Sequence, residues 1–313
     1  MTSRVALVTA REARGLDEDL PPLQAALHAA GMEPQIVDWD DSQAEWASFD
    51  LALLRSTWDY TDRLREFLVW VDSAAAVTTV LNPPAVIRWN TDKHYLAELA
   101  RAGMPVVPST FIEPGENAGR ALTAFLARHD APELVVKPSV GAGSRDTQRH
   151  PRAQFASALA QAQRLLDAQR SVLLQPYLDS VDRDGETALI YFAGRFSHAI
   201  RKGPLLPPGV AGSPAIGLFA PEKITSRTPG ADELRVAERV LAALPSGPPL
   251  YARVDLIRDA AGAPTLLELE LTEPSLFFAH AADSAERFTA AVVEVTKAVG
   301  NPRSLRALQM RPL

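Results

Sequence analysis

Short apolar runs alternate with helical segments over roughly the first 85 residues, and this alternation predicts an α/β domain with an open parallel sheet. Two further observations extend the prediction. Asn82-Pro83-Pro84 breaks the chain, as at a domain boundary. Beyond this break, strand-like runs are joined by short turns, which is typical of antiparallel sheet. The sequence therefore predicts an α/β domain followed by an α+β region.

The N-terminal elements are expected in the order strand, helix, strand, strand, helix, strand. The strands are short apolar runs at residues 4–9, 34–39, 50–55 and 79–81, and the helices at 19–30 and 62–77 have apolar residues near helical spacing. Ligands of parallel sheets bind beyond the carboxyl ends of the strands. Residues 55–60 lie at such an end and are candidates for binding a ligand.

The second part of the chain is expected to contain more hairpins than crossovers. Phe192-Ala193-Gly194-Arg195 and Asp259-Ala260-Ala261-Gly262 are typical of turns between adjacent strands. Residues 204–217 are rich in Pro and Gly, which predicts an irregular mobile loop. We expect helices at 91–102, 118–129, 151–169, 232–244 and 284–298, and strands at 106–111, 133–137, 171–175, 186–193, 195–202, 251–258 and 265–271.

Composition excludes several classes of protein. The 313 residues include 38 acidic and 32 basic side chains, so the net charge of −6 lacks the basic excess of a nucleic-acid binder. The absence of cysteine excludes disulfides, thiolate zinc sites and cysteine nucleophiles. No run approaches about 20 apolar residues, so no membrane span is expected and the default location is the cytoplasm. Neither a P-loop, a GxGxxG motif nor an HExxH motif occurs.

The strongest candidate site is a pair of strands that carry charges at alternate positions. Arg253 and Asp255 share one face of a strand, and Glu268 and Glu270 share a face of the next. Since the connecting turn is short, the strands should pair antiparallel and bring three carboxylates beside one arginine. Such a cluster is costly unless a cation neutralises it, and hard oxygen ligands favour Mg²⁺. The alternative is a solvated strand face on which Arg253 simply pairs with Glu268.

Three further segments carry candidate binding groups. Lys137 ends an apolar strand and precedes a loop of small residues, whose backbone N–H groups can approach phosphate oxygens. Lys93 stands at the start of the helix expected at 91–102, where the helix dipole disfavours a cation and a bound phosphate would relieve the mismatch. The strand at 171–175 leaves the sheet at Pro176 and could present backbone groups to an adenine edge. A plain turn, a surface lysine and an ordinary edge strand are the respective alternatives.

Taken in order, these segments resemble the ATP-grasp superfamily of carboxylate–amine ligases over residues 82–275, most specifically in Arg-Val-Asp followed by Glu-x-Glu. The resemblance implies that Arg253 stabilises the transferring phosphoryl group and that Asp255, Glu268 and Glu270 hold two Mg²⁺ ions, with Mn²⁺ as an alternative. Many members carry Asn where this chain has Glu270, and the extra charge could alter metal affinity or count. The residues that the resemblance assigns to ATP are Lys93, Lys137, Ser139, Gly141, Gly143, Ser144, Gln175, Tyr177, Leu178, Asp182, Glu186 and Lys202.

The substrate side is read from residues at the end of a parallel strand. Arg55 suits a carboxylate and Asp59 an ammonium group, with Ser56 and Thr57 between them, although the same residues could simply cap a helix. Ser275 is assigned to the substrate as well. Three segments resemble those of a branch of the superfamily whose members close O-ureido-D-serine to D-cycloserine. They are RSTWDY at 55–60, NPP at 82–84 and ELELTEPSLFF at 268–278.

That branch implies an ATP-dependent, ADP-forming ligase in three parts: an N-terminal substrate-side domain at 1–85, a central subdomain at 86–180 and a C-terminal subdomain with the metal site at 181–313. The expected partner is a small amino-acid-like molecule, without nucleic acid or membrane, and a homodimer or homotetramer is compatible with it. Two alternatives stay open. One is an intermolecular ligase of the glutathione synthetase or D-alanine–D-alanine ligase type, and the other is a non-catalytic ATP-binding regulator.

Overall fold

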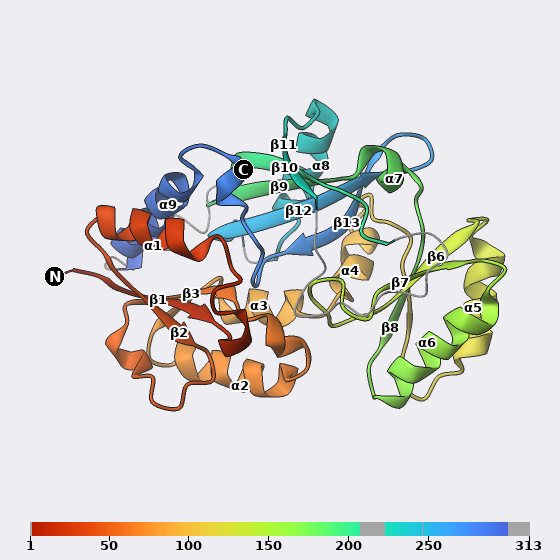
Figure 1. Cartoon of the computed structure of the whole chain (residues 1–313), viewed down its shortest axis with the longest axis horizontal. Coiled ribbons are helices and arrows are strands. Elements are labelled where there is room, and N and C mark those ends of the chain that lie inside the picture. Colours follow the sequence, from red (N-terminus) through yellow and green to blue (C-terminus); the bar gives the residue numbers. More distant parts are fainter. Residues whose placement is uncertain (1, 207–222, 246, 300–313) are drawn as a thin grey trace.

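The computed structural model describes residues 2–206, 223–245 and 247–299, which form three sheets (Figure 1). The N-terminal sheet is parallel, as predicted, in the order β2-β1-β3-β4. Helix α1 (Leu20–Ala29) covers one face and α2 (Leu64–Ala75) the other, because alternate residues of β1 point to opposite sides. The strands are β1 (Arg4–Thr9), β2 (Glu33–Asp38), β3 (Leu51–Ser56) and β4 (Thr79–Leu81).

The central sheet is antiparallel, in the order β5-β8-β6-β7. Helices α5 (Ala118–Arg128) and α6 (Phe155–Asp167) pack their apolar sides on one face of it. Its opposite face turns toward the rest of the molecule (Figure 1). The strands are β5 (Thr110–Ile112), β6 (Glu133–Pro138), β7 (Gln148–Pro151) and β8 (Val172–Pro176).

The C-terminal sheet is also antiparallel, in the order β11-β10-β9-β12-β13. Helices α4 (Tyr95–Arg101) and α8 (Ala231–Ala242) contribute to the core on one face, and α9 (Ser284–Val299) packs on the other. Short helices α3 (Pro84–Asn90) and α7 (Ser180–Asp184) complete the connections. The strands are β9 (Glu186–Phe192), β10 (Arg195–Lys202), β11 (Ile224–Arg227), β12 (Tyr251–Arg258) and β13 (Pro264–Glu270).

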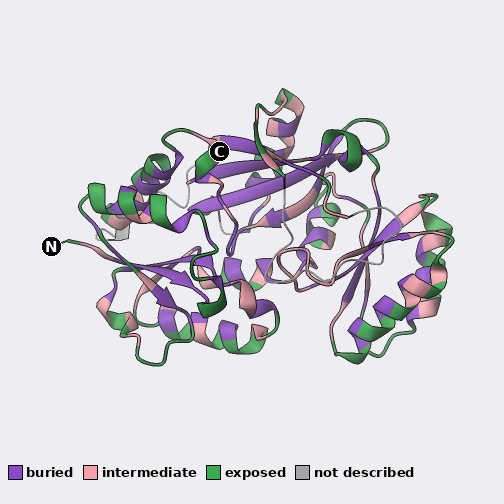
Figure 2. Ribbon diagram, viewed as in Figure 1, coloured by how far each residue is buried: buried purple, intermediate pink, exposed green. Residues whose placement is uncertain are grey.

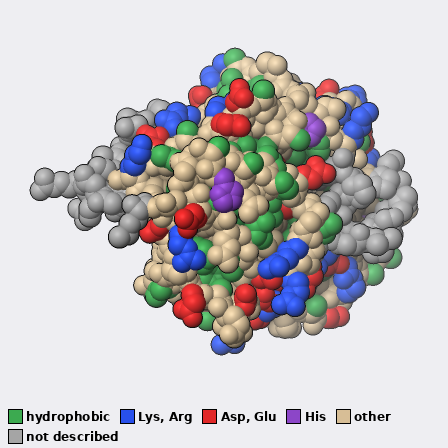
Figure 3. Space-filling model, turned by 60° about the vertical axis from the view of Figure 1, so that its left-hand side comes forward, with side chains coloured by type: hydrophobic (Ala, Val, Ile, Leu, Met, Phe, Trp, Pro, Cys, Tyr) green, Lys and Arg blue, Asp and Glu red, His purple; other side chains and the backbone are tan. Residues whose placement is uncertain are grey.

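Buried residues run along all three sheets, and exposed residues lie on the outer faces of the helices (Figure 2). On the face of the molecule drawn in Figure 3, acidic and basic side chains are intermingled rather than sorted into a basic field. In the part of the chain that the structure describes, none of the helices has the length and apolar character needed to span a membrane.

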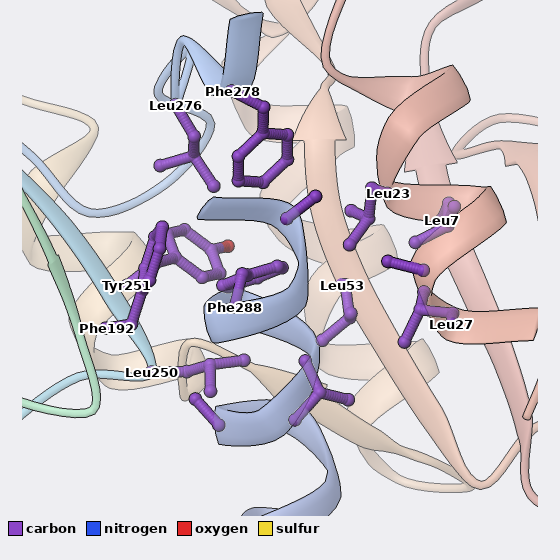
Figure 4. Packing of buried hydrophobic residues seen from close by; sticks show 14 of the residues in the cluster. Leu7, Leu23, Leu27, Leu53, Phe192, Leu250, Tyr251, Leu276, Phe278 and Phe288 are labelled. Atoms are coloured by element: carbon purple, nitrogen blue, oxygen red, sulfur yellow. The ribbon is translucent and has the colours of Figure 1, made fainter. Parts of the chain in front are cut away.

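The N-terminal and C-terminal sheets share one hydrophobic core, in which Phe288 of α9 lies beside Leu53 on one side and Tyr251 on the other (Figure 4). Polar contacts join the same parts of the chain. The Asp19 carboxylate accepts hydrogen bonds from the backbone N–H groups of Phe277 at 3.0 Å and Phe278 at 2.8 Å. The Asn82 side chain donates to the carbonyl oxygens of Tyr251 and Leu271 and accepts from the Leu250 N–H. Asn82, where a domain boundary was expected, is therefore tied by three hydrogen bonds to the C-terminal part of the chain.

Several predicted elements are displaced. The helix expected at 91–102 begins only at Tyr95, and Pro84, taken as a breaker, begins α3 instead. The strand expected at 106–111 is shifted to β5, while Val106 forms an isolated bridge to Leu266. Strands β7 and β11 and helix α7 were not predicted. Most of the loop expected at 204–217 lies outside the described residues.

Candidate active site

A cavity of about 380 Å³ is lined by residues from both antiparallel sheets and from the loops that follow the N-terminal strands. Asp255 lies fully buried next to cavity-lining Arg253. Asp182, Ser139, Arg55, Ser56, Thr57 and Asp59 are not among the lining residues. The cavity brings together these predicted site residues: Lys93, Lys137, Gly141, Gly143, Ser144, Gln175, Tyr177, Leu178, Glu186, Lys202, Arg253, Glu268, Glu270 and Ser275.

The charged face predicted from alternate positions is present on β12 and β13. The strands pair antiparallel, with Arg253 opposite Glu270 and Asp255 opposite Glu268. The guanidinium of Arg253 donates from Nε to Asp255 Oδ1 at 2.9 Å and from Nη2 to Glu270. The expected strand pairing is confirmed, and the alternative pairing of Arg253 with Glu268 is not the one observed.

A lysine of β10 also neutralises Asp255. Lys202 Nζ lies 2.8 Å from Asp255 Oδ2 and 3.0 Å from Glu186 Oε2. Burial raises the pKa of the Asp255 carboxyl, but Arg253 and Lys202 outweigh burial and hold the pKa below its usual value. Asp255 is therefore an ionised carboxylate held between two cations.

Lys93 and Lys137 border the same charges. Lys93 Nζ lies 2.9 Å from Glu268 Oε1 and donates to the Gly141 carbonyl at 2.7 Å. Among the described residues, no carboxylate forms an ion pair with Lys137, and burial lowers the pKa of its amine. Lys137 is therefore a buried cation at the cavity wall with capacity for an anion.

Glu270 and Glu268, the two carboxylates of β13, differ in the direction in which their pKa is shifted. Burial raises the pKa of Glu270 to about 7, and Asp255 and Glu268 add to the effect against Arg253. For Glu268, burial is outweighed by Lys93 and Lys137, which hold its pKa below the usual value. A cation added beside Glu270 would therefore favour the ionised form of its carboxylate.

The small-residue loop after β6 borders the cavity and is bonded at both ends. Gly143 and Ser144 take φ values of 60° and 58°, a region that glycine adopts most easily. Arg145 Nη2 lies 2.6 Å from Thr61 Oγ1 and 2.7 Å from Asp62 Oδ2, so the loop contacts the N-terminal domain. Ser139 is buried, and its carbonyl accepts the Lys93 N–H at 2.9 Å.

An apolar part of the cavity wall comes from both antiparallel sheets. Val135 and Ile257 belong to one buried cluster with Tyr177, and Leu178 and Leu267 pack against it. Val135 lies two residues before Lys137 and Ile257 two residues after Asp255, so strand alternation could have identified both. A flat apolar ligand such as a purine base suits this part of the wall.

Tyr177 is fixed by a polar network that lies outside the cavity wall. The Arg149 guanidinium lies 3.6 Å from the centre of the Tyr177 ring, and the Tyr177 hydroxyl donates to Asp182 Oδ1 at 2.6 Å. Arg149 also pairs with Asp182 at 3.0 Å and with Glu133. Asp182, expected beside a ribose, therefore holds Tyr177, whereas Glu186 lines the cavity. Gln175 donates to Ser109 Oγ at 3.0 Å.

The substrate set expected at the end of β3 is not assembled as a zwitterion site. Arg55 is buried and donates to the Pro274 carbonyl at 2.7 Å, while Asp59 accepts from Trp39 Nε1 at 2.8 Å. The 3-10 turn Trp58–Thr61 carries Asp59 away from Arg55 and toward Arg63 at 3.3 Å. Ser56 and Thr57 are likewise buried, and the Ser56 hydroxyl lies 2.8 Å from Thr9 Oγ1.

Ser275 does line the cavity, and its carbonyl accepts from Arg253 Nη1 at 3.2 Å. Asp17 and Glu273 are lining residues that escaped prediction, whereas Tyr60, which also lines the cavity, lies in the segment 55–60 that was expected to bind a ligand. Asp17 lies in the connection that follows β1. Because ligands bind beyond the carboxyl ends of parallel strands, the argument that identified residues after β3 could have identified Asp17 as well. Glu273 stands between two residues already assigned to the site.

Within residues 2–206, 223–245 and 247–299, no three acidic or histidine side chains are arranged around a single point as metal ligands. Asp255, Glu268 and Glu270 instead contact basic side chains, because opposite charges in a buried cluster pair with one another. The donor set nevertheless fits Mg²⁺, since it consists of carboxylate oxygens and includes Glu270, whose ionised form an added cation would favour.

Comparisons with known proteins agree with this geometry. Residues 5–82 match the family model described as the N-terminal domain of D-cycloserine synthetase DcsG. The cycloserine biosynthesis protein DcsG of Streptomyces lavendulae is 40% identical over 300 residues, which cover 94% of this chain and 99% of that protein. The crystal structure of D-cycloserine synthetase DcsG superposes with a TM-score of 0.86 at 39% identity, over 94% of this chain and 100% of that one.

More distant structures share the fold alone. D-alanine–D-alanine ligase from Bacillus anthracis has a TM-score of 0.68 at 16% identity, over 96% of this chain and 100% of that one. The ATP-grasp ligase PsnB, in complex with a precursor, Mg and ADP, has a TM-score of 0.62 at 19% identity, over 94% of this chain and 98% of that one. Related ATP-grasp ligases thus bind ADP and Mg.

The parallel N-terminal sheet, the two antiparallel sheets and the charged cavity define an ATP-grasp carbon–nitrogen ligase. Within that class, the chain belongs to the family of the cycloserine biosynthesis ligase DcsG.

Proposed function

We propose that this protein uses ATP to close O-ureido-D-serine into D-cycloserine. The observation that carries the proposal is a set of ion pairs at one cavity, in a chain related to DcsG over nearly its full length. Lys93 pairs with Glu268, and both Lys202 and Arg253 pair with Asp255. Each pair can exchange partners when a nucleotide and its metal bind. The basic groups then turn to phosphate and the carboxylates to the metal.

The nucleotide would lie between the two antiparallel sheets. Lys93, Lys137 and Lys202 would bind its phosphates, and the loop at 139–145 would add backbone N–H groups. The apolar wall around Val135 and Ile257 would receive adenine, with Gln175, Tyr177 and Leu178 at its edge. Glu186 lines the cavity and would stand near the ribose, whereas Asp182 would act through Tyr177.

Asp255, Glu268 and Glu270 would hold two Mg²⁺ ions, with Mn²⁺ as an alternative. When bound, the metal neutralises charge on the phosphate oxygens. Arg253 would stabilise the phosphoryl group during transfer, since its guanidinium lines the cavity between Asp255 and Glu270. The protein's own contribution is therefore positioning and charge stabilisation, without a protein nucleophile.

In the proposed reaction, a carboxylate oxygen attacks the γ-phosphorus, the bond to ADP breaks and an acyl phosphate forms. The ureido nitrogen bonded to oxygen then attacks the acyl carbon, loses its proton and displaces phosphate. Because the formulas of O-ureido-D-serine and D-cycloserine differ by one carbamic acid, water must also remove the carbamoyl group as ammonia and carbon dioxide.

The test is to incubate the purified protein with ATP, Mg²⁺ and O-ureido-D-serine. We expect ADP, phosphate and D-cycloserine in equal amounts, identified by mass spectrometry, together with ammonia. A requirement for a second amine would instead identify an intermolecular ligase, and ATP binding without turnover on any amino acid would identify a regulator. The proposal includes a cytoplasmic location, where ATP is supplied, and light scattering would test the predicted homodimer or homotetramer.

A further inference from the structure

Glu273 differs from the other carboxylates that the C-terminal sheet and its loops bring to the cavity. Glu186, Glu268 and Glu270 each contact a lysine or an arginine. Glu273 is only 8% exposed, and among the described residues no basic side chain forms an ion pair with it. A buried carboxylate without a cation is unfavourable unless a ligand supplies the positive charge.

The 3-10 turn Trp58–Thr61 lies against Glu273. The Tyr60 hydroxyl acts on the Glu273 carboxyl and lowers its pKa, and Trp58 Nε1 donates to the Glu273 backbone carbonyl at 3.3 Å. Tyr60 is fixed in turn by stacking on Phe67, with ring centres 5.0 Å apart. Tyr60 and Glu273 both line the cavity, so this rigid acceptor borders the space where a ligand binds.

Glu273 also lies near the charges that the proposed function assigns to phosphoryl transfer. Burial raises the pKa of Glu273 to about 8, the charge of Glu270 adds to this, and Lys93 opposes it. In an α-amino acid, the ammonium nitrogen is two bonds from the carboxyl carbon. The residue that binds the ammonium group must therefore border the site where the carboxylate reacts.

We propose that Glu273 binds the α-ammonium group of the substrate and that Tyr60 positions the Glu273 carboxylate. This assignment rests on the proposed function and deepens it. Ring closure through the ureido nitrogen leaves the α-amino group unchanged, so this group needs binding rather than activation. With the ammonium at Glu273 and basic side chains on the nucleotide side, the cavity orients a zwitterion with its carboxylate toward ATP.

The experiment compares two substrates in the full-length enzyme: O-ureido-D-serine and its analogue without the α-amino group. For Glu273→Gln, we expect KM for O-ureido-D-serine to rise about 30- to 100-fold, as for loss of a hydrogen bond to a charged group. KM for ATP and kcat/KM for the analogue should change less than about threefold. Glu286→Gln, an exposed acid on α9, is the matched control. Tyr60→Phe should give a smaller rise of about 5- to 10-fold, again confined to the amino substrate.

Folding does not confound the test, because replacing an unpaired buried carboxylate with an amide should leave the thermal midpoint equal or higher. Equal losses on both substrates, or a higher Mg²⁺ requirement, would make Glu273 a metal ligand or a structural residue and overturn the assignment alone. Unchanged kinetics in Glu273→Gln would do the same. Failure of the wild-type enzyme to turn over O-ureido-D-serine would overturn the proposed function and this assignment with it.

Discussion

Lys202 Nζ and Asp255 Oδ2 lie 2.8 Å apart although their strands, β10 and β12, are separated in the sheet by β9. The pair therefore spans β9 on the cavity face of the sheet. Arg253 bonds to the same carboxylate, so one buried acid is the shared counter-ion of two basic groups, each of which has a second acidic partner, Glu186 for Lys202 and Glu270 for Arg253.

Asp255→Asn should therefore damage both folding and activity. The substitution leaves Lys202 and Arg253 as buried cations without their shared counter-ion, at a cost of about 3–5 kcal/mol. Phosphate release should fall by at least about 100-fold. Urea unfolding and a phosphate assay measure the two effects.

Glu268→Gln provides the contrast to that variant. Its side chain is 25% exposed, and Lys93 keeps its bond to the Gly141 carbonyl, so the loss of stability should be smaller than for Asp255→Asn. Phosphate release should nevertheless be abolished. Release at the wild-type rate would contradict the assignment of Glu268 to the metal.

Lys137→Met should weaken ATP binding without destabilising the fold. Removal of a buried amine that forms no ion pair among the described residues relieves a desolvation cost, so the thermal midpoint should stay equal or rise. The Kd for ATP should rise about 10- to 100-fold, because a charge-assisted bond to phosphate is lost. Calorimetry measures both the thermal midpoint and the Kd for ATP, with exposed Lys297→Met as the control. An unchanged Kd would show that Lys137 does not bind ATP.

Arg149→Lys should raise KM for ATP about 5- to 10-fold while kcat stays within about twofold. Lysine cannot cover the Tyr177 ring and pair with Glu133 and Asp182 at once, so Tyr177 would lose its fixed position. Arg120→Lys, on the exposed side of α5, is the matched control in steady-state kinetics. A fall in kcat with constant KM would argue against a role in nucleotide binding.

Acid should destabilise the protein through His198. Burial lowers the pKa of His198 to about 4, so the unfolded chain takes up a proton near pH 6.5 while the native state does not. The stability contributed by neutral His198 is present above about pH 6.5 and is lost as the pH falls toward 4, by about 2–3 kcal/mol.

Urea unfolding at pH 7 and pH 4.5 measures that loss. His198→Gln keeps a donor for the Leu276 carbonyl, which His198 Nε2 contacts at 2.8 Å, and should lose less stability over the same interval. Exposed His28→Gln should decline as the wild type does. An equal loss of unfolding free energy between pH 7 and pH 4.5 in all three proteins would exclude His198 as the source of that loss.

Strand alternation predicted the core of the site because side chains two positions apart must share a face. Arg253, Asp255, Glu268 and Glu270 meet for that reason. Asp59 was expected to meet Arg55 at the substrate site but does not, because a turn and not a strand connects the two residues. In a turn, sequence spacing does not fix side-chain direction.

Strand β7 escaped prediction for a different reason. Its residues are polar, and they are buried through bonds instead of apolar packing: His150 contacts Gln161 at 2.6 Å, and Arg149 pairs with Glu133 and Asp182. Hydrophobic periodicity cannot detect such a strand. Glu273 was missed because its partner Tyr60 lies more than 200 positions away in the sequence.

Hydrogen bonds between distant parts of the chain also limit recombination between members of this family. Asp19 bonds to the segment around Phe277, and Asn82 bonds to β12 and its neighbours. A chimera that takes residues 5–82 from one relative and the remainder from another would inherit both sides of these contacts from different parents. Asp19 and Asn82 must therefore match the recipient's backbone for the hybrid to fold.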